Sequence, residues 1–406
     1  MLGFQTKNPR FHPNFLSDDD GLQPNRLRGI TMKSFLNDAI SRASMQATDP
    51  SQIPESASGG RQFSAADQLL LDILESLKTN IKIIGCGGGG TNTIDRLSEV
   101  GVTGAEIYAA NTDAQHLLAI HSPNKLLLGR RITRGLGAGS LPRVGEDAAR
   151  EAELELRGAL DRSDIVFVTA GMGGGTGTGS APYVAKLAKD MGALTVAVVT
   201  YPFKAEGNIR AENAEWGLER LRESADTVIV IPNDKLLEIC PRLAINEAFK
   251  VADEVLVRAI KGITELITKP GLVNLDFNDV KTIMKGAGVA MIGLGESDSD
   301  KNRVEEAIDA AINSPLIDVD ISEATGVLVN ITGGNNMSIS EAERVASVIQ
   351  SRVSPNARII WGAAVDPDLG DAVRVMVVIT GVKSNNILGP GSCRVKTTAE
   401  DIDFID

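Results

Sequence analysis

The chain has 406 residues, of which 43% are hydrophobic and 23% are charged, a balance typical of soluble globular proteins. Its formal net charge of −12 argues against a nucleic-acid-binding protein, because such proteins normally carry a basic face. Only 4% of the residues are aromatic, which also argues against a surface for stacking bases. The length is sufficient for two domains, each with its own core.

The three cysteines, Cys86, Cys240 and Cys393, are far apart, have no CxxC spacing, and do not group with the three histidines. This pattern is typical of a reducing compartment and argues against a disulfide framework or a zinc site. The N-terminus has no apolar signal-peptide core, and no apolar run approaches the roughly 18–20 residues that span a bilayer. We therefore expect a soluble, cytoplasmic protein.

Residues 1–65 are polar and rich in turn-forming residues, so we expect a disordered N-terminal extension. Within it, residues 32–43 place apolar side chains at helical spacing. That segment is either a helix that docks on a partner or a membrane surface, or a satellite helix of the protein's own domain. Its nearly balanced charge weakens the membrane interpretation.

From about residue 80, short Val- and Ile-rich runs alternate with helical patterns. Continuous apolar strands that alternate with helices predict an α/β fold with a doubly wound parallel sheet, whose ligands bind at the carboxyl ends of the strands. We assign residues 66–245 to this domain, including a helix at its N-terminal end. The predicted strands are IKIIG (81–85), AEIYAAN (105–111), DIVFVTAG (164–171), LTVAVVTYP (194–202) and TVIVIPN (227–233).

A long central helix is predicted at 246–270, where one apolar stripe runs from Asn246 to Thr268 and the segment KPGL ends it. Residues 271–383 then contain four apolar, strand-like runs and two helical segments, which predict a smaller α+β domain. We expect residues 384–406 to form a flexible tail.

Two glycine-rich segments follow predicted strands. In the first, IKIIGCGGGGTNT, the spacing Gly85-x-Gly87-x-x-Gly90 matches the dinucleotide-binding fingerprint, and Asn111 or Asp113 lies roughly where a ribose-binding acid would be. Alone, this signal is weak, because a tight strand–helix turn also explains it. The second, GMGGGTGTGS (171–180), has six glycines in nine residues and is followed by a helix that Thr178 or Ser180 is able to cap.

A dinucleotide fold needs only one such loop, whereas two loops on neighbouring strand ends are able to surround a longer phosphate chain. The sequence has no Gly-Lys dipeptide, so neither loop is a P-loop. Charge compensation then falls to helix N-termini, backbone N–H groups and a bound Mg²⁺. We interpret the glycines as positions where a side chain would keep the backbone from the phosphates, and a triphosphate as the best ligand.

The segment GGGTGTGSAP (173–182) resembles the tubulin signature loop, and residues 80–383 resemble the FtsZ family, the tubulin-like cell-division GTPases of prokaryotes. The segment TRGLGAGS and the tail resemble archaeal members. The resemblance implies a GTPase that assembles head to tail into polar filaments of the division ring. It also implies GTP/GDP and Mg²⁺ as ligands, a mid-cell location, and a membrane-tethering adaptor that binds a tail.

The resemblance further implies which residues bind GTP. The phosphates would contact Gly88, Gly89, Gly90, Thr91 and Asn92 in the first segment and Gly173, Gly174, Gly175, Thr176, Gly177 and Thr178 in the second. Asn111 and Asp113 would lie near the ribose, phosphates or metal, whereas Glu206 and Arg210 would hold the ribose and the phosphate edge. Apart from the resemblance, Glu206 and Arg210 read as an ordinary i,i+4 surface pair. The Mg²⁺ would be carried by the nucleotide, with no protein side chain assigned to it.

For the guanine edge the resemblance offers Asn233 and Asp253. An aspartate is able to accept hydrogen bonds from both N1–H and N2–H₂ of guanine, a pattern that adenine does not supply. Phe249, one turn earlier, either stacks on the base or packs in the core.

The segment GLVNLDFNDVK carries Asn274, Asp276 and Asp279, and the two aspartates share one face at a predicted helix start. Helix capping alone would explain them. However, about twenty helical residues, or ~30 Å, separate them from Asp253, so they would reach the γ-phosphate of a neighbouring chain stacked head to tail. The resemblance implies the same: Asp276 and Asp279 would orient the attacking water, supported by Asn274.

Two other functions remain open at this point. A dinucleotide-binding oxidoreductase explains the first glycine segment but neither the second nor NLDFNDVK. A paralogue that binds nucleotide without hydrolysing it is disfavoured by Asp276 and Asp279, which such a protein could lose without harm to its fold.

Overall fold

The computed structural model describes residues 79–239, 245–269, 271–273, 275–299, 302–317, 321 and 324–382. All of them belong to one compact unit, Leu74–Asp406. The predictions for residues 1–65, for the helix preceding β1 and for the tail at 384–406 lie outside the described residues.

In the described part of the chain, ten strands form one sheet in the order β3-β2-β1-β4-β5-β6-β7-β10-β8-β9. The strands are β1 (Ile81–Cys86), β2 (Ala105–Asn111), β3 (Asn124–Leu127), β4 (Ile165–Gly171), β5 (Leu194–Tyr201), β6 (Thr227–Pro232), β7 (Gly288–Ser297), β8 (Gly326–Gly333), β9 (Arg358–Val365) and β10 (Val373–Thr380). All five strands predicted before residue 245 and all four after it are present. The short edge strand β3 was not predicted.

Strands β1 to β6 are parallel, as predicted. The parallel pairing continues from β6 to β7 over Thr227–Ile229, so the smaller domain extends the same sheet. Strand β10 then runs antiparallel to both β7 and β8. The mixed pairing explains why the strands after residue 271 read as an α+β pattern.

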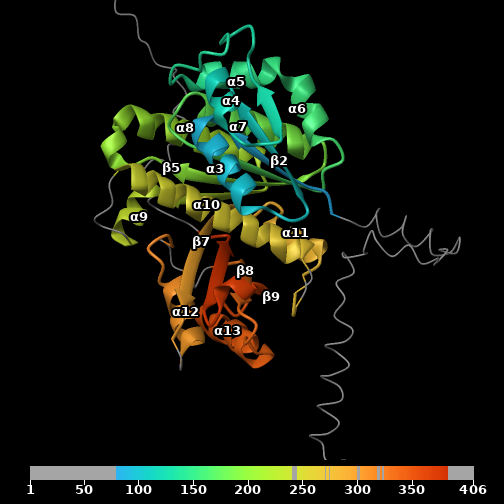
Figure 1. Ribbon diagram of the computed structural model, residues 1–406, viewed down its shortest axis with the longest axis vertical. Coiled ribbons are helices and arrows are strands. Elements are labelled where there is room, and N and C mark those ends of the chain that lie inside the picture. The colour runs from blue at the N-terminus through green and yellow to red at the C-terminus, as the bar shows by residue number, and fades with distance from the viewer. Residues whose placement is uncertain are drawn as a thin grey trace, which may run out of the picture. The chain divides into compact units, whose positions relative to one another are not determined.

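Helices cover both faces of the sheet, as Figure 1 shows. They are α3 (Gly87–Val100), α4 (Ala114–Ala119), α5 (Pro142–Glu151), α6 (Glu153–Leu160), α7 (Thr176–Asp190), α8 (Asn208–Ser224), α9 (Asn233–Ile239), α10 (Ile245–Thr268), α11 (Phe277–Met284), α12 (Arg303–Ile312) and α13 (Ile339–Arg352). None of the described helices is long and apolar enough to cross a membrane.

Alternation along β1 shows how the two faces are built. Ile81 and Ile83 lie in the core that includes side chains of α3 and α10, whereas Ile84 and Cys86 lie in the opposite core with side chains of α5 to α8. A strand buried on both faces is apolar at nearly every position, and in β1 the exception is Lys82, which pairs with Glu106. The doubly wound arrangement is confirmed.

The predicted central helix is present as α10, Ile245–Thr268. Its apolar stripe is buried: Ala259, Ile260 and Ile263 are fully inaccessible to solvent. The helix contacts α3 and β5 of the larger part of the fold and β8 and β9 of the smaller domain, and it lies between these parts in Figure 1. Burying each large apolar side chain stabilises the fold by about 1.5–3 kcal/mol, so α10 holds both parts of the sheet together.

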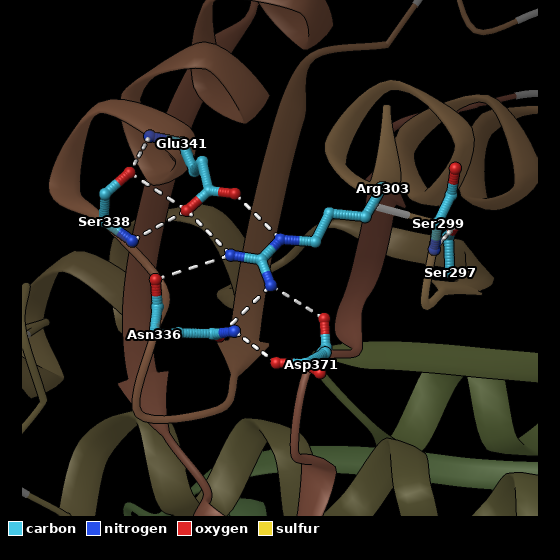
Figure 2. Close-up of polar contacts among 7 residues, drawn as sticks. All are labelled: Ser297, Ser299, Arg303, Asn336, Ser338, Glu341 and Asp371. Atoms are coloured by element: carbon cyan, nitrogen blue, oxygen red, sulfur yellow. Dashed lines mark hydrogen bonds and ion pairs between the residues drawn. The ribbon is translucent and has the colours of Figure 1, made fainter. Parts of the chain in front are cut away.

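A polar cluster ties the loops of the smaller domain together (Figure 2). Arg303, at the start of α12, donates to both carboxylate oxygens of Glu341, at 2.8 and 3.1 Å. The same guanidinium donates to the Asp371 carbonyl oxygen at 2.7 Å and to Asn336 Oδ1 at 3.1 Å. Glu341 also accepts the backbone N–H of Ser338 at 2.8 Å. The hydrogen bond from Arg303, more than any other influence, lowers the pKa of Glu341 to about 2.

This cluster predicts acid sensitivity. Because the pKa of Glu341 in the folded protein lies below its ordinary 4.5, its contribution to stability is complete above about pH 4.5 and is lost as pH falls towards 2. Glu341→Gln should lower the free energy of unfolding at pH 7 by about 1–3 kcal/mol and weaken its dependence on pH below 4.5. Denaturant titrations at pH 7 and pH 3 measure both effects.

The matched control is Asp309→Asn, because the pair of Asp309 with Arg352 is about half-exposed on both sides. Exposed pairs contribute about 0–1 kcal/mol, so this variant should remain close to the wild type. Equal stability losses in the two variants would contradict the role assigned to Glu341.

Candidate nucleotide-binding site

Five parallel strands end at the same edge of the sheet. Their register places Cys86, at the end of β1, beside Ala110 of β2 and Ala170 of β4, and the ends of β5 and β6 follow in order. The segments after these strands converge there, as a doubly wound sheet requires. An open cleft of about 380 Å³ lies at this edge.

Twelve of the predicted nucleotide-binding residues line this cleft: Gly88, Gly89, Asn92, Gly174, Gly175, Thr176, Gly177, Glu206, Arg210, Asn233, Phe249 and Asp253. Six do not line it: Gly90, Thr91, Asn111, Asp113, Gly173 and Thr178. The cleft also includes residues that the sequence did not single out, namely Ser140, Gly171, Met172, Thr200, Pro202 and Ala252. Thr200 and Pro202 could have been found, since they lie at the carboxyl end of the predicted strand 194–202.

Two helices begin at the cleft. The first glycine segment was predicted to be a loop followed by a helix. That prediction was wrong, because α3 begins at Gly87, directly after β1. The second helix, α7, begins at Thr176 after the short loop 172–175. The first N–H groups of a helix have no partner within the helix and carry a partial positive charge, so both helix starts favour an anion.

The glycines at these helix starts have two different roles. A Cβ atom on Gly87 would lie 2.5 Å from the Gly177 nitrogen, and one on Gly177 would lie 2.9 Å from the Cys86 carbonyl oxygen. In contrast, a Cβ on Gly88 or Gly174 would meet no atom within 4 Å. Part of the glycine requirement therefore comes from close packing of the two helix starts, and not only from the approach of a ligand.

The side chains predicted to cap α7 form other hydrogen bonds. Ser180 lies inside the helix and donates to the Thr176 carbonyl oxygen at 2.6 Å, and the N-terminal cap residue, Gly175, offers no side chain. Thr178 Oγ1 accepts the backbone N–H of Gly173 at 2.9 Å. The capping prediction was wrong, because Thr178 instead fixes the loop in which Gly173 adopts a positive φ of 99°.

The segment 111–113 does not line the cleft but contacts the start of α7, which does. Asn111 is buried, and Asp113 caps α4 by accepting the N–H groups of Gln115 and His116 at 2.9 and 3.1 Å. Between them, Thr112 Oγ1 lies 2.6 Å from Thr176 Oγ1, which joins the segment to the start of α7.

Glu206 and Arg210, which both line the cleft, form an ion pair. Glu206 is nearly buried, and its other oxygen accepts the Phe203 N–H at 2.9 Å, whereas the side chain of Arg210 is half-exposed. The carboxylate therefore holds Arg210 at the cleft, which distinguishes the pair from an ordinary surface pair.

One end of the cleft is shaped by Asn233, Phe249 and Asp253. Asn233 is 3% exposed, and its Oδ1 atom has no hydrogen-bond partner among the described residues. Burial raises the pKa of Asp253 to about 6, against the opposing charge of Arg96. Phe249 is 39% exposed, so it is not a core residue, and its ring packs edge-on against that of Phe203 with 5.2 Å between the ring centroids. This end therefore offers one hydrogen-bond acceptor without a partner among the described residues, Asn233 Oδ1, together with the Asp253 carboxylate and an exposed aromatic ring.

Asp276 and Asp279 do not line the cleft. Both are exposed at the start of α11, where Asp276 accepts the Asn278 N–H at 3.3 Å, so the predicted capping is present. From Asp253, α10 continues only fifteen residues to Thr268, about 22 Å rather than the predicted ~30 Å. The following loop is fixed to β9, because the Leu272 N–H donates to the Ala363 carbonyl at 2.8 Å. Asn274 lies outside the described residues.

Comparisons with known proteins identify this arrangement. Residues 80–241 match the Tubulin/FtsZ family, GTPase domain, and residues 288–383 match the FtsZ family, C-terminal domain. The chain is 55% identical to cell division protein FtsZ 1 of Archaeoglobus fulgidus, across 92% of this chain and 99% of that relative. The chain belongs to the FtsZ family.

Other relatives agree with this assignment. Cell division protein FtsZ of Haloferax mediterranei is 53% identical, across 92% of this chain and all of that relative. The solved structure of an FtsZ dimer from M. jannaschii matches with a TM-score of 0.75 at 54% identity, covering 78% of this chain and 92% of that one. The chain is therefore a GTPase of the tubulin/FtsZ fold, and the oxidoreductase alternative is set aside.

The two glycine roles predict different effects on stability for two similar substitutions. Gly177→Ala should lower the free energy of unfolding by about 1–3 kcal/mol, because its new methyl group would overlap the Cys86 and Gly171 carbonyl oxygens. Gly174→Ala should change it by less than about 0.5 kcal/mol, because its methyl group enters open space. Denaturant unfolding without nucleotide measures both, and equal stabilities would contradict the packing role of Gly177.

Proposed function

We propose that the cleft binds GTP with its phosphates over the starts of α3 and α7 and its guanine at the end formed by Asn233, Phe249 and Asp253. The chain then assembles head to tail, and Asp276 and Asp279 of the next subunit complete the active site. In this arrangement GTP hydrolysis is coupled to growth of a polar filament.

The observation that carries the proposal is the unsatisfied acceptor at the base end. A buried polar atom without a partner costs about 1–3 kcal/mol, so Asn233 Oδ1 favours a ligand that brings a donor. Asp253, when ionised, adds acceptors beside it. Guanine carries N1–H and N2–H₂ donors on one edge, whereas adenine carries an acceptor at N1, so this pair of side chains favours guanine. The ring of Phe249 is exposed enough to contact the base.

The other end suits a phosphate chain. Gly88 and Gly174 leave space beside the two helix starts, and Arg210 adds a positive charge. The acids that line the cleft are Glu206, which is paired with Arg210, and Asp253, which lies at the base end. This donor set fits an Mg²⁺ ion that is held mainly by phosphate oxygens and that would offset their charge.

Hydrolysis needs a water molecule aligned with the γ-phosphate, and phosphoryl transfer depends mainly on positioning and electrostatics. Asp276 and Asp279 are the candidates, but the path of α10 and the fixed loop after it keep them from their own cleft. Their exposure is what supports a contact with a neighbouring chain. A contact between two different surfaces repeats without closing, so it generates a filament.

The names of the relatives support a role in cell division. We infer that the filament acts at the mid-cell division site in the cytoplasm and binds a membrane-tethering adaptor through a tail. A nucleotide-binding paralogue that does not hydrolyse GTP is less well supported, because it has no need for Asp276 and Asp279.

Asp253 predicts a pH dependence. Its pKa of about 6 lies above its ordinary 3.8, so without nucleotide the folded state loses stability as pH rises through this interval. GDP, which favours the ionised form, should bind more tightly as pH rises through about 6. Asp253→Asn should remove this rise and weaken GDP binding at pH 7.5 by about 10–100-fold. Calorimetric titrations between pH 5.5 and 7.5 measure it.

The control for this experiment is Glu265→Gln, which removes a carboxylate from the far part of the same helix, where it pairs with Lys269. GDP affinity should not change in this variant. Wild-type affinity in Asp253→Asn would show that the guanine end has been misassigned.

The shared site is tested by mixing variants. Asp279→Ala should bind GTP normally but hydrolyse it about 100-fold more slowly or worse, since it removes a positioning group. Mixed with Asp253→Ala, which lacks a working cleft but supplies Asp279, it should regain activity.

A second measurement follows GTP hydrolysis by the wild type against protein concentration, alongside light scattering, with Mg²⁺ and an ATP control. The specific activity and the scattering should rise together above a threshold concentration.

Asn278→Ala is the matched control, because Asn278 is exposed on the same turn of α11 and only its backbone N–H takes part in the cap. This variant should hydrolyse GTP like the wild type. If no mixing ratio restores turnover and the specific activity does not depend on concentration, the site is complete within one chain.

A further inference from the structure

The ring of His116 contacts three residues at the phosphate end of the cleft. His116 is half-buried in α4, and its Nε2 lies 3.1 Å from Asn92 Oδ1. Its Nδ1 lies 3.1 Å from Thr91 Oγ1 and 3.2 Å from Asn111 Nδ2. Asn92 lines the cleft, whereas Thr91 and Asn111 are buried behind it.

We propose that His116 is a positioning residue that holds Asn92 with its amide NH₂ group available to a phosphate. This proposal rests on the proposed binding of GTP in the cleft. His116 does not line the cleft, so it acts on a nucleotide only through the residues that its ring contacts.

The hydrogen bonds around the ring determine which nitrogen carries the proton. Asn111 Oδ1 accepts the Thr112 N–H at 2.8 Å, so the amide NH₂ of Asn111 is the group that faces His116. The Thr91 hydroxyl lies 3.1 Å from Nδ1 and 2.7 Å from the Gly87 carbonyl oxygen, so its one hydrogen is shared between these two acceptors. With the Asn111 amide donating to it, Nδ1 of the neutral ring is an acceptor, and Nε2 carries the hydrogen. That hydrogen is donated to Asn92 Oδ1.

This hydrogen bond determines which end of the Asn92 amide faces a ligand. The amide of an asparagine has an acceptor end and a donor end, and a rotation by 180° exchanges them. With Oδ1 occupied by His116, only the NH₂ donors remain for a ligand. If His116 were absent, the amide would be free to turn its oxygen towards a phosphate, where two acceptors repel each other.

The same ring links the walls of the cleft. It joins the first turns of α3, through Thr91 and Asn92, to the segment 111–113. Thr112 of that segment contacts Thr176 at the start of α7. The backbone N–H of His116 donates to the Asp113 carboxylate, which fixes the backbone from which the ring extends.

Two conservative substitutions separate positioning from a general effect on structure. The amide nitrogen of a glutamine reaches about as far as Nε2 of histidine, so His116→Gln is able to keep the donation to Asn92. Asparagine is shorter and is able to replace only the acceptor at Nδ1. GDP affinity should fall about tenfold in His116→Ala and His116→Asn but less than threefold in His116→Gln.

The coupling to Asn92 is measured by a double-mutant cycle. Asn92→Ala should lower GDP affinity, and adding His116→Ala should lower it by less than a further twofold, because both remove the same contact. Adding His116→Ala to Asp253→Asn should multiply the two losses, because Asp253 acts at the base end. His121→Ala is the matched control, since the His121 side chain is 78% exposed and pairs with Asp95.

The outcomes distinguish this inference from the proposed function. Losses in His116→Ala and His116→Asn, recovery in His116→Gln and non-additivity with Asn92→Ala would support the role of His116. Equal losses in all three His116 variants, or independent losses with Asn92→Ala, would overturn it. If Asp253→Asn lowers GDP affinity but His116→Ala does not, only the role of His116 fails; if neither does, the proposed cleft fails.

Discussion

Burial of the apolar stripe of α10 is the interaction on which the rest of this structure depends. Its side chains share one core with residues from both parts of the sheet, including Phe167 of β4 and Leu328 of β8. The same helix carries Asp253 at the cleft and leads into the loop before Asp276. Because a helix is stiff over this length, it fixes both the position of Asp253 in the cleft and the distance to the exposed acids.

The cleft is a product of close backbone packing. Gly87 and Gly177 allow the starts of α3 and α7 to touch, which concentrates two sets of unpaired N–H groups at one place. Loop 172–175 is held by Thr178, and segment 111–113 is joined to α7 through Thr112. A chain with a net charge of −12 thus provides an electropositive location without a cluster of lysines.

Polar groups divide the site into parts with different tasks. One end of the cleft has the unpaired Asn233 Oδ1 and the carboxylate of Asp253, the other has two helix starts and an arginine paired with Glu206, and the exposed aspartates line neither. In the proposed filament the aspartates reach a cleft only across a subunit contact. On that proposal, one chain binds GTP and its neighbour supplies the acids that hydrolysis needs.

The sequence by itself determined the parallel strands and the central helix, because periodicity is a local signal, and its resemblance to the FtsZ family supplied most of the residues that line the cleft. It did not reveal that α3 begins at Gly87 or that the two domains share one sheet. It also missed His116, whose contact with Thr91 joins residues 25 positions apart. Such contacts arise only when separate strands are placed side by side, so the tertiary structure alone decided which polar side chains support the site.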